Sequence, residues 1–127
     1  TGKYIRVAPG AHNEAPTIFK RKGIYWMITS GCTGWEPNAA RMFSAPSIWG
    51  PWKQHSNPCR GEKSEITFGG QGTFVQQVYG KKDAYVFMGD MWRPKFPIDG
   101  RYMWLPVKFE KDIPYLEWMD EWDLDFL

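Results

Sequence analysis

The chain has 127 residues and a formal net charge of +2, with 43% hydrophobic and 24% charged residues. This size and composition fit one globular domain and exclude a disordered segment. The small net charge excludes a strong electrostatic field for nucleic acid, and no apolar run approaches the ~20 residues that span a membrane. The 8 Trp, 6 Tyr, 8 Phe, 13 Gly and 10 Pro residues indicate aromatic strands joined by tight turns, and so an all-β fold.

The first half of the chain contains a predicted hairpin followed by further strands. Ala15–Phe19 and Ile24–Thr29 are rich in β-branched and aromatic residues, and a short basic, glycine-containing turn separates them. Ala40–Ala45 predicts a third strand, and residues 48–52 predict a turn with a short edge strand. A polar, Gly-rich loop is expected from about His55 to Gly72.

The second half repeats this order of elements. Thr73–Val78 and Ala84–Met88 predict a second hairpin, and Arg101–Phe109 predicts one long strand. Tyr115–Met119 predicts the last strand of the chain. No window between the Gly and Pro residues keeps a 3.6-residue period, so no helix is predicted.

The two halves are offset by about 60 residues, as Arg41 and Arg101 show. A repeat of this size with four strands is typical of a β-propeller blade. The chain has room for about two blade-like units, residues 14–70 and 71–127, plus a closing strand, whereas propellers close with roughly four to eight blades. We therefore expect a partial β-propeller whose remaining blades come from a missing N-terminal segment or a second chain. A compact β-sandwich of the same strands is the alternative.

Two aromatic loops are candidate sugar-binding elements. Trp35 and Trp92 each follow the second strand of a predicted hairpin, so the repeat puts them at the same end of a propeller. Sugar rings stack on such aromatic faces, and Asn38, Asp90 and Arg93 could contact sugar hydroxyl groups from the same loops. The alternative is that the two Trp rings only fill the gap between blades.

Two polar residues are candidate catalytic groups. Glycoside hydrolysis uses two carboxyl groups that flank the bond, one of them protonated. Glu14 lies just before the first predicted strand, where a propeller's axial channel would be, and Gln71 occupies the equivalent place in the second unit. A solvated Glu and a Gln that only bonds to backbone are the simpler interpretations. Glu62 and Glu65 in the central loop are further possible site residues.

The cysteines and histidines do not predict a metal site. Cys32, Cys59, His12 and His55 lack the spacing of a zinc centre, and the two cysteines fit either a disulfide or two free thiols. We expect no cofactor and no metal, and a structural cation in the channel of a complete propeller stays open. The sequence begins with Thr rather than Met, as a processed product would, and we expect a secreted or periplasmic protein.

The motifs resemble glycoside hydrolase family 43. Glu14–Lys20 and Gly23–Ser30 are similar to the family's third-blade motif: a Glu, a small residue, Pro, an apolar strand, a Lys/Gly turn and a Tyr-rich strand. The motifs at 33–38 (Thr-Gly-Trp-Glu-Pro-Asn) and 120–124 (Asp-Glu-Trp-Asp-Leu) are fairly specific for its galactan-active branch, the exo-β-1,3-galactanases and related β-galactosidases. The resemblance covers nearly the whole chain and includes Ser30–Asn38, Gly50–Trp52, Asn57–Cys59, Gly69–Thr73, Met88–Pro94, Arg101–Pro106 and Asp120–Leu124.

This resemblance implies a five-bladed propeller that hydrolyses galactan or other β-galactosides with inversion. It implies that Glu14 is the general acid. It also implies that the general base, and an Asp that modulates the pKa of the acid, come from two blades that precede this motif. Gln71 matches a Gln that is proposed as the base in relatives without the usual one. The aromatic and polar loop residues would then bind galactose. A non-catalytic carbohydrate-binding or structural half-propeller is the alternative function.

Overall fold

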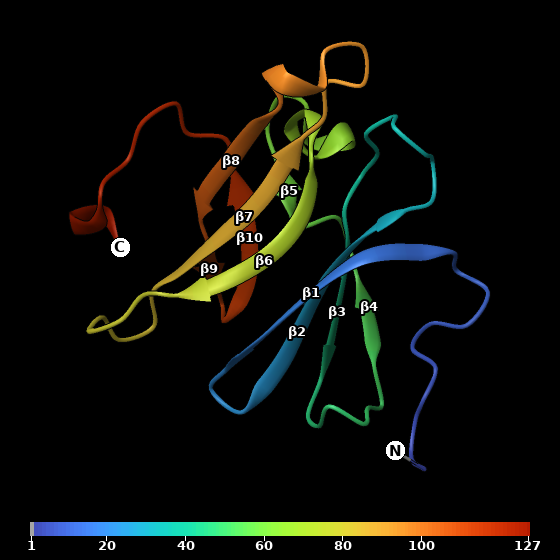
Figure 1. Ribbon diagram of the computed structural model, residues 1–127. Coiled ribbons are helices and arrows are strands. Elements are labelled where there is room, and N and C mark those ends of the chain that lie inside the picture. Colours follow the sequence, from blue (N-terminus) through green and yellow to red (C-terminus); the bar gives the residue numbers. More distant parts are fainter. Residues whose placement is uncertain (1) are drawn as a thin grey trace.

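The computed structural model describes residues 2–127, and its regular structure is almost entirely β-strand (Figure 1). The expectation of an all-β fold is confirmed. The only helices among the described residues are three short 3₁₀ turns, which are η1 (Ser64–Gly69), η2 (Pro97–Asp99) and η3 (Leu124–Phe126).

Two antiparallel sheets contain most of the strands, and each follows the order of the chain. The first sheet has four strands, which are β1 (Asn13–Arg21), β2 (Ile24–Gly31), β3 (Arg41–Ala45) and β4 (Lys53–His55). The second has three strands, which are β6 (Gln71–Gln77), β7 (Tyr85–Met91) and β8 (Arg101–Pro106). This up-and-down order is the one that the propeller interpretation predicted.

A third, smaller sheet draws its strands from both halves of the chain. It contains β5 (Cys59–Arg60), β10 (Ile113–Glu117) and β9 (Lys108–Glu110), in that order. The strands β5 and β10 run parallel, and β9 and β10 run antiparallel. A two-residue strand with a partner more than fifty residues away has no local sequence signal, and the polar loop predicted over this region contains both β5 and η1.

Two other predicted strands differ from the structure. The expected strand Arg101–Phe109 is divided at Val107. Pro106, opposite Val86, is its last residue paired with β7, and after Val107 the chain enters the third sheet. The edge strand expected within residues 48–52 lies at β4 instead. Gly50 has a φ of 91°, which is a turn conformation and not a strand conformation.

The first two sheets meet through β1 and β6, their first strands. Gly72 makes this approach possible, because a Cβ at its position would lie 2.9 Å from the ring of Phe87 and 3.2 Å from the Thr17 methyl group. The buried core around this contact includes Phe19, Trp26, Ile28, Met42, Phe87, Leu105 and Leu116. The close approach of β1 and β6 also brings the starts of the two strands together.

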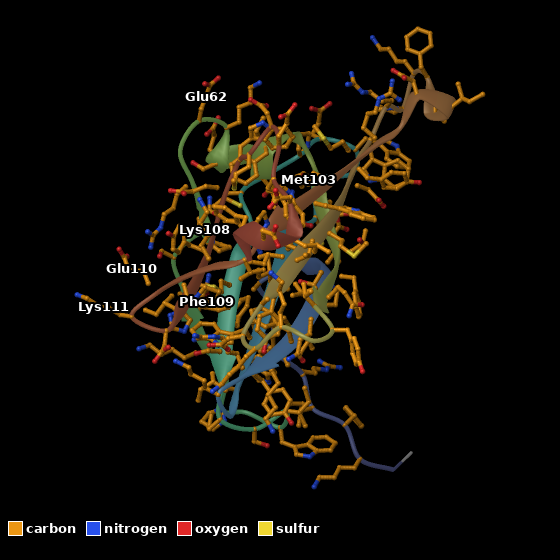
Figure 2. The ribbon with its side chains drawn as sticks, turned by 90° about the vertical axis from the view of Figure 1, so that its left-hand side faces the viewer. Glu62, Met103, Lys108, Phe109, Glu110 and Lys111 are labelled. Carbon is orange, nitrogen blue, oxygen red and sulfur yellow. The ribbon has the colours of Figure 1, made fainter. Side chains whose placement is uncertain are left out.

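A buried arginine joins all three sheets at the other end of β1. Arg21 is 7% exposed and bonds to Asp83 in the β6–β7 turn at 2.6 Å and to Asp112 in the β9–β10 turn at 2.8 Å. Its guanidinium group also lies 3.8 Å from the centre of the Phe109 ring. Figure 2 shows Phe109 in β9, close to the turn with Lys111 at the edge of the molecule. Arg21 therefore fixes the sheets relative to one another.

Both cysteines are unpaired thiols. Cys32 is exposed, whereas Cys59 is buried, and burial raises the pKa of the Cys59 thiol to about 12. Cys59 is therefore a neutral core residue at ordinary pH. Within residues 2–127, no helix has the length and apolar character needed to cross a membrane.

Candidate functional site

Glu14 lies in an irregular part of β1. It pairs with Ser30 on β2, but the register shifts before pairing resumes at Thr17. Within this bulge, Ala15 has a φ of 49°, a left-handed conformation that is uncommon for a residue with a side chain. Bulges and such conformations often occur beside active sites, where they set the direction of a side chain. Glu14 itself is half-buried.

Gln71 occupies the corresponding place on β6 and contacts Glu14. Its Nε2 donates to Glu14 Oε1 at 2.9 Å and to Ser30 Oγ at 2.6 Å. The Gln71 amide therefore uses both N–H groups, and its Oε1 remains as an acceptor. The register of β6 shifts after Gly72, one residue beyond Gln71, and the register of β1 shifts after Glu14. The structure thus brings the two candidate catalytic side chains together.

Ser30 is the member of this group that the sequence did not single out. It is 6% exposed and lies opposite Glu14 in the β1–β2 pairing. A serine at the end of an apolar strand has no motif of its own. The only signal was the register of the β1–β2 hairpin. This register places Ser30 opposite Glu14 only if the bulge at Ala15 is included.

The two candidate aromatic residues also come together. The rings of Trp35 and Trp92 meet edge to face, with centroids 4.8 Å apart, and the side chains are 61% and 50% exposed. This pair lines a cavity of about 110 Å³ together with Ser30, Asn38 and Gln71. A small hollow with an aromatic wall and a few polar groups is typical of a site for a small ligand.

Asn38 holds the loop that carries Trp35. Its Oδ1 accepts from the Gly31 N–H at 2.7 Å, and its Nδ2 donates to the Gly31 carbonyl at 3.0 Å and to Thr33 Oγ1 at 2.6 Å. The amide therefore closes the loop between residues 31 and 38. Asn38 lines the cavity, but most of its hydrogen-bonding capacity is used within the loop, so a contact with sugar stays a prediction.

Asp90 and Arg93 lie to one side of this cavity. They line a neighbouring hollow of about 180 Å³, and Trp92 lines both spaces. Asp90 is half-buried and pairs with Gln71 across β6 and β7, and Arg93 is exposed. Of the loop glutamates, Glu62 lines a different pocket, and Glu65 is an exposed residue of η1.

Arg41 fixes the segment that leads into Glu14. Its Nη1 donates to the Ala11 carbonyl at 2.5 Å and to Asn13 Oδ1 at 2.7 Å. This ties β3 to the backbone just before β1 and so supports the Glu14 position. Within the described residues 2–127, no three His, Cys, Asp or Glu side chains are grouped so that they could hold a metal ion.

Comparison with known proteins identifies the family. The model of glycosyl hydrolases family 43 matches residues 1–112. A solved family 43 β-1,3-galactosidase with galactodeoxynojirimycin is 57% identical, with a TM-score of 0.93 over 98% of this chain and 36% of the other. None of the curated proteins matches the chain.

Two exo-β-1,3-galactanases are also similar. The enzyme from Phanerochaete chrysosporium, solved with galactose, is 35% identical over 84% of this chain and 24% of its own, with a TM-score of 0.74. The same enzyme was solved in variant form with β-1,3-galactotriose. The enzyme from Clostridium thermocellum is 38% identical over 83% of this chain and 23% of its own, with a TM-score of 0.70. The chain thus spans about a third or less of the length of these proteins.

Proposed function

The chain belongs to glycoside hydrolase family 43, and from this premise we propose that it supplies the general acid and part of the sugar pocket of an enzyme that hydrolyses galactan. The observation that carries the proposal is the Glu14–Gln71–Ser30 cluster beside the Trp35–Trp92 pair. A carboxyl group that is held by a hydrogen bond close to an aromatic pair can supply one of the two carboxyl groups that glycoside hydrolysis uses.

The fold is proposed to be part of a five-bladed propeller. The sheet β1–β4 and the sheet β6–β8 would be two neighbouring blades, and the rest of the ring would come from residues outside this chain. The up-and-down order of both sheets and the structural likeness to the family 43 galactosidase support this proposal. In such a ring, Glu14 and Gln71 would face the axial channel from adjacent blades.

Glu14 is proposed to protonate the glycosidic oxygen as the bond breaks. Gln71 would hold the Glu14 carboxyl group in place through its amide N–H. Inverting glycosidases separate their acid and base by about 6.5–9.5 Å, which leaves room for the sugar and a water molecule. Gln71 is in hydrogen-bond contact with Glu14, so this contact favours a group from the missing blades, and not Gln71, as the base that activates water.

The substrate is proposed to be a galactose-containing oligosaccharide or polysaccharide with β-linkages. Trp35 and Trp92 would provide the apolar surface against which a galactose ring packs, and Asp90 and Arg93 would contact hydroxyl groups at the rim. The galactose and galactotriose bound to related enzymes support this substrate class. Acid–base hydrolysis uses water as its second reactant, so the proposal includes no cofactor.

The product formed from β-1,3-galactan tests the proposal. The complete propeller is expected to release galactose that is first seen by proton NMR as the α-anomer, because inversion of a β-linkage gives this product. Glu65→Gln is the control for Glu14→Gln, since Glu65 is exposed and outside the cavity. If the protein binds galactotriose but releases no galactose, the chain belongs to a non-catalytic carbohydrate-binding protein, and the proposed hydrolysis is refuted.

A further inference from the structure

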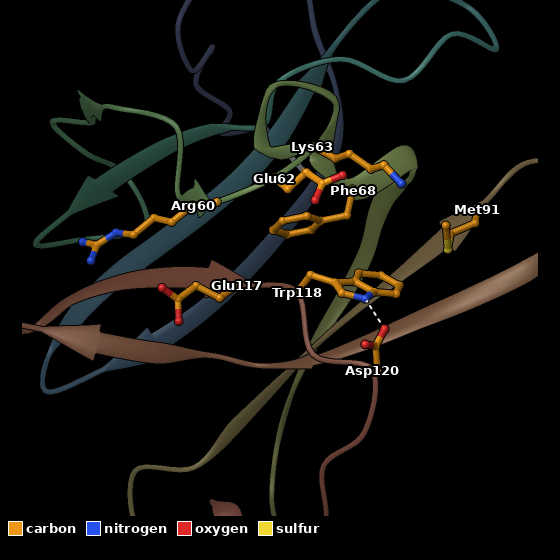
Figure 3. Close-up of a pocket in the computed structure, with 9 residues that line it drawn as sticks. Arg60, Glu62, Lys63, Phe68, Met91, Glu117, Trp118 and Asp120 are labelled. Atoms are coloured by element: carbon orange, nitrogen blue, oxygen red, sulfur yellow. Dashed lines mark hydrogen bonds between the residues drawn. The ribbon is translucent and has the colours of Figure 1, made fainter.

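A second pocket, much larger than the cavity of the Trp35–Trp92 pair, lies outside the Glu14 site. It has a volume of about 720 Å³ and is formed by β5, the loop before η1, the end of β7 and the segment that follows β10. Figure 3 shows the Trp118 and Phe68 rings as neighbours among the residues that line this pocket. The two ring centroids are 6.0 Å apart, and Trp118 is 44% exposed whereas Phe68 is 4% exposed. Trp118 therefore presents part of its surface above a buried aromatic floor.

The Trp118 ring is held in a fixed orientation. Its indole N–H donates to Asp120 Oδ1 at 2.8 Å, as the dashed line in Figure 3 marks. The bond uses the one polar group of the indole, so the exposed remainder of the ring is apolar. A fixed apolar ring surface suits a flat, weakly apolar ligand, because little conformational entropy is lost when the ligand packs against it.

Of the charged groups around the pocket, Glu62 and Lys63 have no side-chain partner within residues 2–127, and Asp120 bonds only to the Trp118 indole N–H. Arg60 bonds to Glu110 at 3.0 Å, and Glu117 bonds to Lys108 at 2.8 Å. Among the described residues, neither Glu62 nor Lys63 forms a side-chain hydrogen bond or an ion pair. Their charges are opposite, Asp120 adds a negative charge that has no ion-pair partner in the described part of the chain, and together these groups offer both acceptors and donors. This combination favours a neutral ligand with many hydroxyl groups over an anionic one.

This pocket lies close to the candidate sugar site. Gly69 lines the cavity of the Trp35–Trp92 pair, and Met91 lines the large pocket. The Met91 methyl group is 3.7 Å from the position that a Cβ at Gly69 would take.

We propose that this pocket, which we call the Trp118 pocket, binds a second neutral sugar segment of the polysaccharide that the Glu14 site is proposed to cleave. The inference rests on the proposed function for its ligand class, but on separate residues for its geometry. Sugar packs against Trp118, and its hydroxyl groups bond to Glu62 and Lys63. A polymer held there remains close to the Glu14 site between cleavage events.

NMR of the tryptophan indole groups tests the proposal. The ¹⁵N-labelled chain is titrated with β-1,3-galactotriose, both unchanged and as the double variant Trp35→Ala/Trp92→Ala. We expect the Trp118 signal to shift in both proteins, with the same apparent Kd. Trp49 is the internal control, because it is 48% exposed, lies outside the Trp118 pocket and should not shift. Movement of the Trp35 and Trp92 signals reports separately on the proposed Glu14 site.

Surface variants keep the test independent of folding. Glu62→Gln with Lys63→Met changes only exposed side chains and should weaken the Trp118-dependent binding about tenfold, since hydrogen bonds are lost. Trp118→Ala should abolish it. A Trp118 signal that stays still in the unchanged chain, or that shifts only while Trp35 and Trp92 are present, would overturn the inference. If Trp118 shifts but Trp35 and Trp92 do not, the pocket is confirmed and the proposed sugar contacts of the Glu14 site fail.

Discussion

The Gln71 side chain donates to the Glu14 carboxyl group at 2.9 Å, although the two residues are 57 positions apart in the chain. This hydrogen bond joins the first strands of two sheets. Ser30 accepts the second N–H of the same amide at 2.6 Å. If the Gln71 amide turned over, its oxygen would face the Glu14 carboxylate, and the two oxygens would repel each other. Ser30 and Glu14 together therefore fix the orientation of the Gln71 amide, with its nitrogen toward both of them.

The first prediction concerns Ser30 as a positioning residue. Ser30→Ala removes one of the two acceptors that hold Gln71, and kcat on galactan should fall by about tenfold or less, the effect of one hydrogen bond. KM should change less than kcat, because the Ser30 hydroxyl group is hydrogen-bonded to Gln71. Ser56→Ala is a matched control on an exposed serine. A loss that appears only in KM, or a Ser30→Thr variant that does not recover activity, would contradict this role.

The second prediction concerns the ion pairs of Arg21. Asp83→Asn should lower the free energy of unfolding by about 2 kcal/mol, because it weakens the strongest partner of a buried guanidinium group. Denaturation in urea, followed by tryptophan fluorescence, measures this change. Asp99→Asn is the control, since Asp99 pairs only with the exposed Arg101 at the surface. Equal effects of the two substitutions would show that Arg21 does not link the sheets.

The third prediction follows from the pKa of Asp112. Hydrogen bonds from Lys22 and Arg21 lower this pKa below the usual value. The folded state therefore holds the Asp112 proton less tightly than the unfolded state, so the contact stabilises the fold above about pH 4, the usual Asp pKa, and is lost as the pH falls through the lowered value. Asp112→Asn should reduce the Tm at pH 7, and the difference from the unchanged chain should shrink below pH 4. A difference that is constant with pH would refute this.

The fourth prediction concerns Gly72, where β1 and β6 approach. Gly72→Ala places a methyl group 2.9 Å from the fully buried ring of Phe87, which has no room to move. The overpacking should cost about 1–3 kcal/mol in the free energy of unfolding. Gly2→Ala, which meets no atom within 4 Å, should have no effect. A neutral Gly72→Ala would mean that the two sheets can move apart without loss.

The sequence predicted those parts of the fold that have local signals. The hairpin β1–β2 and the hairpin β6–β7 were predicted from runs of β-branched and aromatic residues and the turns between them. The repeat placed Glu14 and Gln71 at equivalent positions, and the structure brings them into contact. The loops of Trp35 and Trp92 were related by the same repeat, and the structure packs the two rings together.

Features that depend on distant partners were not predictable. Arg21 lies in a basic turn that resembled an ordinary solvated loop, yet its partners Asp83 and Asp112 are 62 and 91 residues away. The division of the strand at Val107 and the short strand β5 both depend on the third sheet, which no local pattern marks. Ser30 was missed because a bulge at Ala15 sets its neighbourhood, and Ala is not a residue that usually marks a positive φ.

The role of Glu14 as the general acid is tested most directly by comparing two leaving groups in the complete propeller. Glu14→Gln keeps an amide oxygen that can accept the Gln71 hydrogen bond, but it has no proton to transfer. Turnover of β-1,3-galactan should fall by ~10²–10⁴-fold, whereas 2,4-dinitrophenyl β-galactoside, whose leaving group needs no proton, should react at close to the unchanged rate. Equal losses on both substrates, or no loss on galactan, would contradict the assignment of Glu14 as the acid.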